Sequence, residues 1–236
     1  MSGMKMIDKN AAILMSNTPH LAKKILRKEI RGLIAQQMAA EGNWENIREK
    51  ESASVVKKLV SSERFLNAKR LSIYISNEQE ICTDDVVRKA LREGKEVFIP
   101  RFKKGAERME MLRLESETEF DSLESTLWGI RQHPAHLSPT AFDETHAKSN
   151  VTPKLSQTPK TFITEPLDLV VMPGLAFTTS GKRLGHGRGF YDRFLNDYAQ
   201  KYETAPKTIG LALKVQLVDD LPMESKDRMV DLLIHA

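Results

Sequence analysis

The sequence predicts an α/β fold, a three-layer sandwich in which helices flank a mainly parallel sheet. Short apolar runs rich in branched residues alternate along the chain with longer segments whose apolar residues recur at helical spacing. The run LDLVVMP, over residues 167–173, is apolar enough for a strand that is covered on both faces, as in parallel sheets. Capping residues and glycines mark the helix ends.

The first half of the chain predicts two long helices followed by strands alternating with a helix. Thr18 before Pro19 is a helix start signal, and Gly42 ends this helix. Asn43 caps a second helix that runs to Leu59. The elements that follow are a strand at 70–76, a helix from Thr83 to Leu91, a strand at 96–100 and a half-exposed strand at 109–115.

The second half repeats this alternation after a polar stretch. We expect strands at 167–173, 207–213 and 229–235, with a helix from near Gly189 to Tyr202. Residues 135–166 are rich in Ser, Thr, Pro and Lys and are too polar to bury, which indicates a long loop or partly disordered insertion. The domain prediction is a flexible tail at 1–17 and one domain at 18–236 that carries this insertion.

The amino-acid composition limits the kinds of ligand and the cellular compartment that we expect for this protein. The 236 residues contain 36 Lys and Arg against 32 Asp and Glu, a net charge of +4, which favours anionic ligands without a nucleic-acid tail. A lone cysteine, Cys82, excludes an internal disulfide framework and fits a reducing compartment. No apolar stretch approaches the ~18 residues of a membrane helix, and no signal or transit peptide stands out. We therefore expect a cytoplasmic protein, rather than a mitochondrial one, that binds neither membrane nor nucleic acid.

The segment GKRLGHGRGFYDRF, residues 181–194, predicts an anion site. It lies between an apolar strand and a helix, where α/β folds bind ligands. Glycines let successive backbone N–H groups converge on an anion, and the helix N-terminus points the same way. Basic side chains add charge-assisted hydrogen bonds to phosphate; they are Lys182, Arg183 and Arg188. A mobile surface loop with solvated charges is the alternative.

Known phosphate motifs do not describe this loop. A P-loop needs Ser or Thr after its glycine–lysine pair, and Gly181-Lys182 is followed by Arg183. In a dinucleotide fingerprint the third glycine would come one residue later than it does here. Arginine–glycine RNA segments occur in disordered repeats, whereas this segment is embedded in core-like sequence.

Two aspartates follow the loop. Asp192 falls in the first helical turn, where it either complements the helix dipole or binds Mg²⁺. Asp231 interrupts an apolar strand, where a charge needs water or a metal. Together with a phosphate loop, the two carboxylates suggest MgATP.

A second basic cluster lies on the first helix, opposite its apolar stripe. It consists of Lys23, Lys24, Arg27, Lys28 and Arg31. Such a run is usually a solvated face. Lys23 and Arg27 are four residues apart and project side by side, so they could clamp the same phosphates from across a cleft.

These residues give the chain a resemblance to the 5-formyltetrahydrofolate cyclo-ligase family over roughly residues 20–130 and 167–235. The most specific match is MPGLAFTTSGKRLGHGRGFYDRFL, and KKILRKEIR, SIYISNEQEICT, VFIPR and LWGI match in the same order. The resemblance implies a Rossmann-like sandwich of the kind seen in cyclo-ligases and sugar-phosphate isomerases. It also implies that 5-formyltetrahydrofolate and ATP, with Mg²⁺, give 5,10-methenyltetrahydrofolate, ADP and phosphate.

The family's functional positions carry over residue by residue. Those implied for the nucleotide are Lys23, Lys24, Arg27, Trp128, Arg183, Leu184, Gly185, His186, Gly187, Arg188, Gly189, Phe190 and Tyr191. Those implied for the folate, with or without a polyglutamate tail, are Ile75, Glu80, His186, Gly187, Arg188, Gly189 and Phe190. Arg183 and Arg188 would act on the transferred phosphoryl group, and Asp192 and Asp231 match the magnesium positions.

Some residues depart from the family pattern. Phe190 stands where tyrosine is usual, so one hydroxyl is lost, and Arg188 stands where lysine is common. Thr178 replaces a frequent aspartate. None of these changes removes an implied phosphate or metal ligand, so activity is expected.

Two other functions stay open at this stage. A phosphate-binding isomerase or coenzyme A transferase on a similar fold explains the loop but not the second basic cluster with two aspartates. A nucleic-acid binder would need an aromatic and basic platform, which the sequence lacks. We expect a monomer whose partner is its small-molecule substrate.

Overall fold

The computed structural model describes residues 18–40, 43–125, 129–134, 163 and 165–236. A six-stranded sheet crosses this range in the order β10-β9-β6-β1-β2-β3. Its strands are β1 (Arg70–Ile73), β2 (Glu96–Arg101), β3 (Glu110–Leu114), β6 (Leu169–Met172), β9 (Lys207–Ala212) and β10 (Leu232–His235). All neighbouring pairs are parallel except β2 and β3, which are antiparallel. The predicted mainly parallel sheet is confirmed.

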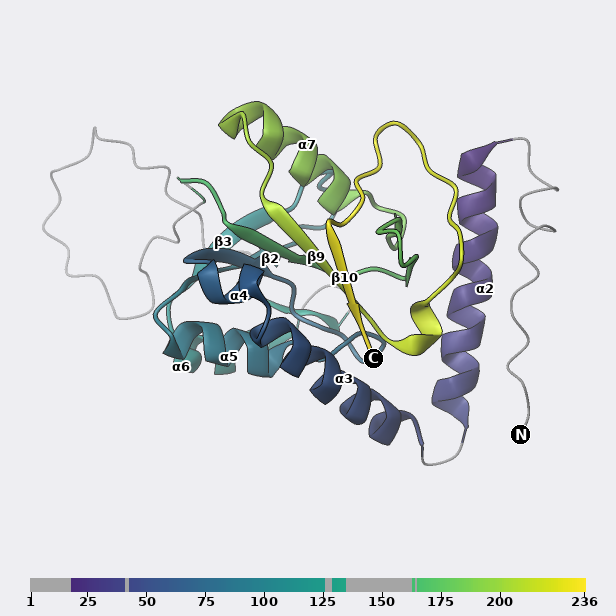
Figure 1. Ribbon diagram of the computed structural model, residues 1–236, viewed down its shortest axis with the longest axis horizontal. Coiled ribbons are helices and arrows are strands. Elements are labelled where there is room, and N and C mark those ends of the chain that lie inside the picture. Colours follow the sequence, from purple (N-terminus) through teal and green to yellow (C-terminus); the bar gives the residue numbers. More distant parts are fainter. Residues whose placement is uncertain (1–17, 41–42, 126–128, 135–162, 164) are drawn as a thin grey trace, which may run out of the picture.

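Helices cover both faces of the sheet (Figure 1). One face carries α3 (Trp44–Val60), α4 (Glu63–Asn67), α5 (Asp84–Arg92) and α6 (Glu117–Asp121), and the other carries α7 (Phe190–Tyr202). The long helix α2 (Pro19–Ala39) stands beside the sheet and packs against the 3₁₀ turn η2 (Lys214–Gln216). Pro19 at the first position of α2 and the Ser62 hydroxyl that caps α4 show how local sequence sets these boundaries.

The core lies on both sides of the central strands. All four residues of β6 are buried, which confirms the strand predicted to be covered on both faces. In register, Leu71 of β1 lies between Val97 of β2 and Leu169 of β6. Among the described residues, no helix is both long and apolar enough to cross a bilayer.

Three elements differ from the sequence prediction. The edge strand β3 is more buried than the expected half-exposed strand, because three of its five residues are buried and the other two are partly covered. β10 covers only the last part of 229–235 and is partly exposed, as an edge strand is. Two short hairpins were not predicted, β4 (Glu124–Ser125) with β5 (Arg131–Gln132) and β7 (Ala176–Phe177) with β8 (Arg183–Leu184).

Most of the predicted tail and insertion lies outside the described residues. At the end of the insertion, however, Ile163 is buried, and its carbonyl accepts a hydrogen bond from the Tyr202 hydroxyl at 2.9 Å. This residue therefore departs from the expectation that the whole segment is too polar to bury.

The strand order places a ligand site. The chain passes from β1 outward to β2 and β3, then returns to β6 on the other side of β1. In parallel sheets a crevice opens beyond the carboxyl ends of the two strands at such a reversal. The carboxyl ends of β1 and β6 are therefore the expected place for a ligand.

Candidate functional site

A cavity of about 340 Å³ opens at this edge. It is formed by α2, by the segments at the ends of β1, β2 and β6, by the residue before β5 and by the segment that leads from β8 into α7. The lining residues are Arg31, Tyr74, Ile75, Asn77, Glu80, Pro100, Phe102, Ile130, Pro173, Arg183, Gly185, His186, Arg188, Gly189, Phe190, Tyr191 and Asp192. Most of the lining surface is apolar.

The glycine loop, residues 185–189, joins β8 to α7. It is shorter than predicted, because residues 176–184 fold into the hairpin of β7 and β8. Gly187 and Gly189 have φ angles of 109° and 66°, a left-handed conformation that other residues rarely adopt. Gly189 is also the N-cap of α7. Glycine is therefore required at these two positions for the loop to turn into the helix.

Two arginines of α2 hold this loop by its backbone. Arg27 donates from Nε to the Gly185 carbonyl at 2.9 Å, and Arg31 donates from Nη2 to the His186 carbonyl at 3.1 Å. Burial and the nearby Arg31 charge lower the pKa of Arg27 from its ordinary value. The predicted meeting of the basic helix and the glycine loop is thus observed, with loop carbonyls as the partners. Lys24 is exposed and does not line the cavity.

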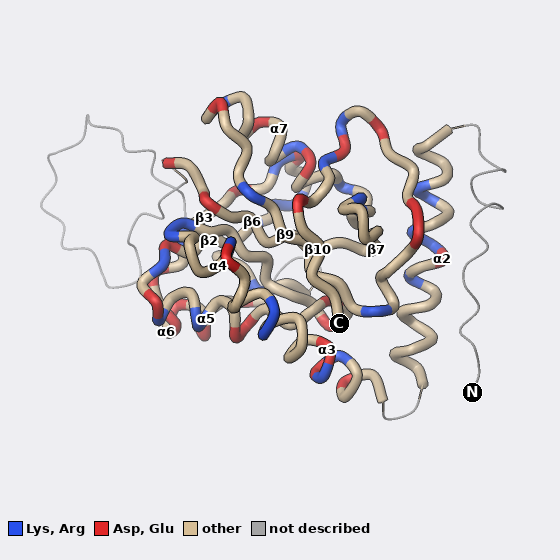
Figure 2. The backbone as a smooth tube through the Cα atoms, viewed as in Figure 1, with Lys and Arg blue, Asp and Glu red and all other residues tan. Residues whose placement is uncertain are grey.

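Lys23 lies one turn before Arg27 and is only 5% exposed. Its ammonium group donates to Glu224 at 2.8 Å and to Asp227, two carboxylates from the segment between η2 and β10. Figure 2 shows acidic positions of this segment beside basic positions of α2. The sequence predicted that Lys23 binds phosphate. In the structure its partners are two carboxylates instead. The hydrogen bond from Lys23 lowers the pKa of Glu224.

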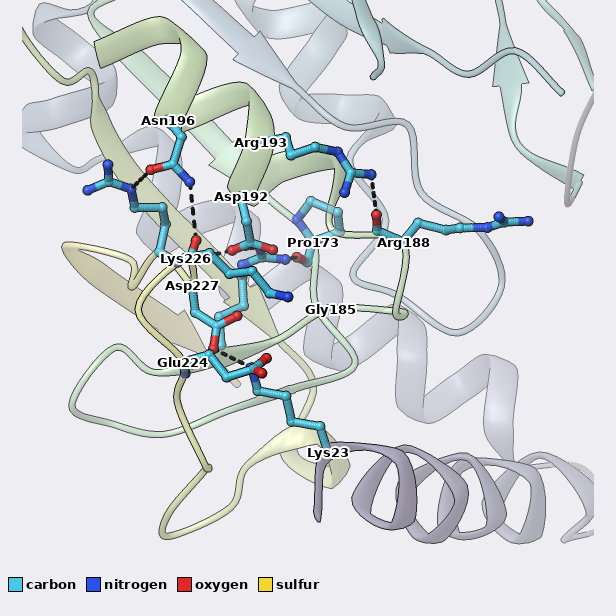
Figure 3. Close-up of polar contacts among 12 residues, drawn as sticks. Lys23, Pro173, Gly185, Arg188, Asp192, Arg193, Asn196, Glu224, Lys226 and Asp227 are labelled. Atoms are coloured by element: carbon cyan, nitrogen blue, oxygen red, sulfur yellow. Dashed lines mark hydrogen bonds and ion pairs between the residues drawn. The ribbon is translucent and has the colours of Figure 1, made fainter. Parts of the chain in front are cut away.

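Arg183 and Asp192 form an ion pair at the base of the glycine loop. Arg183 is 7% exposed and donates to Asp192 Oδ1 at 3.0 Å and to the Pro173 carbonyl at 3.3 Å. Asp192 Oδ1 also accepts from the backbone N–H of Arg228 at 3.0 Å. The chain thus brings Asp227 next to Asp192, and Figure 3 shows both carboxylates in one cluster with Glu224 and Lys23.

The structure does not bring Asp231 to this cluster. Asp231 Oδ2 accepts from the backbone N–H of Thr208 at 2.7 Å and from its hydroxyl at 3.1 Å. Thr208 belongs to the first residues of β9, so Asp231 lies at the amino edge of the sheet, opposite the cavity. A carboxylate at this edge cannot share a metal ion with Asp192. The pairing of Asp192 with Asp231 is corrected accordingly, and Asp227 is the carboxylate that lies nearby.

The segment after β1 contributes Ile75 and Glu80 to the cavity lining, and the resemblance implied both for the folate. Glu80 is 5% exposed; Oε2 accepts from the Asn77 backbone N–H at 3.0 Å, and Oε1 lies 3.4 Å from His186 Nε2. Tyr191, which also lines the cavity, has a buried hydroxyl with no hydrogen-bond partner in the described part of the chain. Burial and the Glu80 charge raise the pKa of Tyr191 well above its ordinary value. Its hydroxyl is therefore an unused hydrogen-bond donor on a residue that lines the cavity.

The remaining predicted residues divide into three groups. Gly185, His186, Arg188, Gly189 and Phe190 line the cavity, and Gly187 lies among them in the loop. Leu184 is buried in β8 and pairs by its backbone with Leu175. Trp128 lies outside the described residues.

Sequence reasoning missed part of the cavity wall. Phe102 stacks near Phe190 with ring centroids 5.1 Å apart. The Gln132 amide exchanges two hydrogen bonds of 2.9 Å with the Phe102 backbone. These bonds hold Ile130, two residues earlier, at the cavity. The VFIPR motif correctly predicted the strand that leads to Phe102. The contacts of Phe102 with Gln132 join residues about thirty positions apart, so no local pattern in the sequence predicts them.

Comparisons with known proteins identify the family that this chain is similar to. Residues 20–236 match the model of the 5-formyltetrahydrofolate cyclo-ligase family. A protein of Caenorhabditis elegans named a probable 5-formyltetrahydrofolate cyclo-ligase is 38% identical over 215 residues, 91% of this chain and 94% of that protein. The 5-formyltetrahydrofolate cyclo-ligase of Mus musculus is 31% identical over 218 residues, 92% and 95% of the two chains.

A solved structure shares the fold. The 5,10-methenyltetrahydrofolate synthetase of Aquifex aeolicus superimposes with a TM-score of 0.61 at 23% identity, covering 90% of this chain and 88% of that one. The family match spans nearly the whole described range, and two relatives above 30% identity cover most of their own length. The chain therefore belongs to the 5-formyltetrahydrofolate cyclo-ligase family, a family of ATP-dependent ligases.

Proposed function

We propose that this chain binds 5-formyltetrahydrofolate in the cavity, with MgATP beside it at the glycine loop, and closes the folate to 5,10-methenyltetrahydrofolate. The observation that carries the proposal is the combination of apolar cavity walls with two buried polar side chains, one of which lacks a hydrogen-bond partner in the described chain. The Tyr191 hydroxyl has no partner in the described chain, and Glu80 faces the same cavity. Buried polar groups are normally satisfied, so a ligand with complementary groups would complete them.

The cavity suits a flat heterocycle with polar edges. Phe102, Ile130 and Phe190 supply apolar surface against which a ring can lie. The Glu80 carboxylate can accept hydrogen bonds from amino and ring N–H groups, while the Tyr191 hydroxyl can donate to a ring acceptor. A pterin carries both kinds of group, which supports the folate assignment.

The glycine loop suits the phosphates of ATP. Backbone N–H groups at the N-terminus of α7 are unused by the helix and attract an anion. Arg188 lines the cavity with an exposed side chain, and Figure 3 shows it extended away from Asp192. We propose that this exposed side chain turns toward the glycine loop when ATP binds and contacts a phosphoryl group between the two substrates.

The carboxylates fit a magnesium ion that phosphate helps to hold. Asp192 and Asp227 each use one oxygen in the described hydrogen bonds, Oδ1 and Oδ2 respectively, which leaves a second oxygen on each. No group of three or more metal-binding side chains occurs among the described residues. Magnesium at nucleotide sites usually takes one or two carboxylates with phosphate oxygens and water. Bound there, Mg²⁺ would neutralise charge on the phosphates.

The reaction follows from this arrangement. The formyl oxygen attacks the γ-phosphorus, an O–P bond forms, and the bond to ADP breaks. N10 then attacks the formyl carbon, and phosphate leaves with the former formyl oxygen while N10 releases its proton. Arg188 and the loop N–H groups would stabilise charge on the phosphoryl group during its transfer. Glu80 and Tyr191 would hold the pterin so that the formyl oxygen faces the loop. Arg183 already forms an ion pair with Asp192, so its role would be to orient that carboxylate.

An isotope experiment tests the proposal. The protein is incubated with MgATP and 5-formyltetrahydrofolate that carries ¹⁸O in the formyl group. We expect absorbance of the methenyl product and one ¹⁸O atom in each released phosphate. Unlabelled phosphate, or no methenyl product, would contradict the proposed reaction. The family match favours this ligase over the isomerase alternative, while monomeric state and any polyglutamate preference stay predictions.

A further inference from the structure

Arg193 ties the glycine loop to a second loop. It lies in the first turns of α7 and donates from Nε to the Glu107 carbonyl at 2.7 Å. Nη2 donates to the Arg188 carbonyl, a contact drawn in Figure 3. The guanidinium carbon also lies 5.7 Å from the centroid of the Phe190 ring. One side chain thus contacts the loop between β2 and β3, the glycine loop and a wall of the cavity.

These contacts fix the orientation of a peptide group. A trans peptide is planar, so its C=O and the N–H of the next residue point in opposite directions. With the Arg188 carbonyl turned toward Arg193, the N–H of Gly189 points away from it. Arg27 and Arg31 hold the carbonyls of Gly185 and His186 in the same manner. Guanidinium groups therefore set three peptide planes of the glycine loop.

The loop needs such support because its glycines favour no single conformation. Gly187 and Gly189 adopt left-handed backbone geometry at no steric cost, and they adopt many other geometries equally well. When the binding-competent form is only partly populated, the apparent affinity falls by that fraction. A residue that fixes the peptide at 188–189 thus raises affinity for the ligand of the loop without touching it.

We infer that Arg193 is a positioning residue: it holds the glycine loop in its anion-binding conformation by linking the Arg188 carbonyl to the Glu107 carbonyl. The identity of the anion, MgATP, rests on the proposed function. Arg108 offers a matched control. It joins the same β2–β3 loop to the same helix through Asp197 at 2.7 Å, yet it touches no atom of the glycine loop in the described contacts.

The test compares Arg193→Ala with Arg108→Ala in the full chain by two measurements. The first is amide hydrogen exchange at residues 187–190 without ligand, and the second is the dissociation constant for MgATP. We expect Arg193→Ala to speed exchange and to raise the dissociation constant about tenfold, the scale of a lost hydrogen bond to a charged donor. Arg108→Ala should change neither, because an exposed ion pair contributes little. Arg193→Lys keeps the charge but reaches one carbonyl at a time and should fall in between.

The outcomes separate this inference from the proposed function. Equal exchange at 187–190 in the two alanine variants, or an unchanged MgATP dissociation constant in Arg193→Ala, would overturn the role of Arg193. If the wild-type chain binds no MgATP, the proposed function fails, and the exchange comparison still decides whether Arg193 orders the loop. Alanine favours helix, so α7 itself should tolerate the change. If the Arg193→Ala variant unfolds at a much lower temperature than the wild type, the same two measurements are made on the Arg193→Lys variant.

Discussion

The two edges of the parallel sheet use carboxylates in different ways. At the amino edge, Asp168 accepts from the backbone N–H groups of Lys69 and Arg70 at 2.8 and 2.9 Å, and Asp231 accepts from Thr208. At the carboxyl edge, Glu80 and Asp192 also accept backbone N–H groups. The side chain of Asp231 is 48% exposed, whereas that of Glu80 is 7% exposed. The carboxylates at the two edges accept the same kind of hydrogen bond. They differ in how exposed their side chains are.

The difference shows where the fold can do chemistry. A carboxylate in water interacts weakly with other charges, whereas one in a partly closed cavity interacts strongly. The amino-edge aspartates tie neighbouring strands together at their start. The carboxyl-edge groups keep binding capacity inside a cavity, beside a loop that attracts anions. The predictions below challenge this division.

The largest effect should come from Asp192→Asn set against Asp231→Asn. The amide keeps an oxygen that can accept from the Arg228 N–H but loses the charge that a magnesium ion needs. We expect kcat/KM with MgATP to fall about 100-fold or more for Asp192→Asn. Asp231→Asn should keep activity and lose about 1 kcal/mol of stability at most. Equal losses of activity would erase the distinction between the edges.

Arg188→Ala should come next. If its guanidinium contacts the phosphoryl group more strongly during transfer, kcat should fall on the order of 100-fold while the affinity for ATP changes less. Arg188→Lys should recover part of the loss. Lys24→Ala, which removes an exposed charge outside the cavity, should keep kcat. If steady-state kinetics show a wild-type kcat for Arg188→Ala, the loop binds ATP without acting on the phosphoryl group during transfer.

Glu80→Gln should weaken folate binding with a smaller effect on MgATP. Loss of a charge-assisted hydrogen bond in a buried site predicts a rise in the folate KM of about tenfold or more. Glu78 lies two residues earlier on the same loop and is exposed, so Glu78→Gln is the matched control and should behave as wild type. A similar KM in both variants would place the pterin elsewhere.

The smallest effect, with opposite signs in two assays, is expected for Tyr191→Phe. Removing a buried hydroxyl that lacks a partner should stabilise the ligand-free protein by about 1 kcal/mol in thermal or denaturant unfolding. Folate affinity should fall about fivefold, since the donor is lost. Because burial raises the pKa of Tyr191, the wild-type hydroxyl stays protonated. The affinity ratio of the two proteins should therefore be constant between about pH 7 and about pH 9. Lower stability of the ligand-free variant would show that the hydroxyl already has a partner.

The sequence predicted the parts of the molecule that depend on local patterns. Apolar runs and capping signals located the central strands and helices, and GHGRG located the loop at the carboxyl edge. Asp231 shows the limit: a charge in an apolar strand suggested a metal, but its partner is Thr208 in the neighbouring strand. The acids that hold Lys23 lie some two hundred residues away, and the peptide contacts of Arg193 involve carbonyls, which every residue has. Such partners follow from the tertiary fold alone.

Ligand protection by amide hydrogen exchange tests the division between the edges most directly. The protein is compared alone and with 5-formyltetrahydrofolate plus a non-hydrolysable analogue of MgATP. We predict slower exchange at residues 75–80 and 185–192, which lie at the carboxyl edge, and unchanged exchange at residues 69–70, 207–208 and 231 at the amino edge. Protection at the amino edge, or none at residues 185–192, would contradict the account.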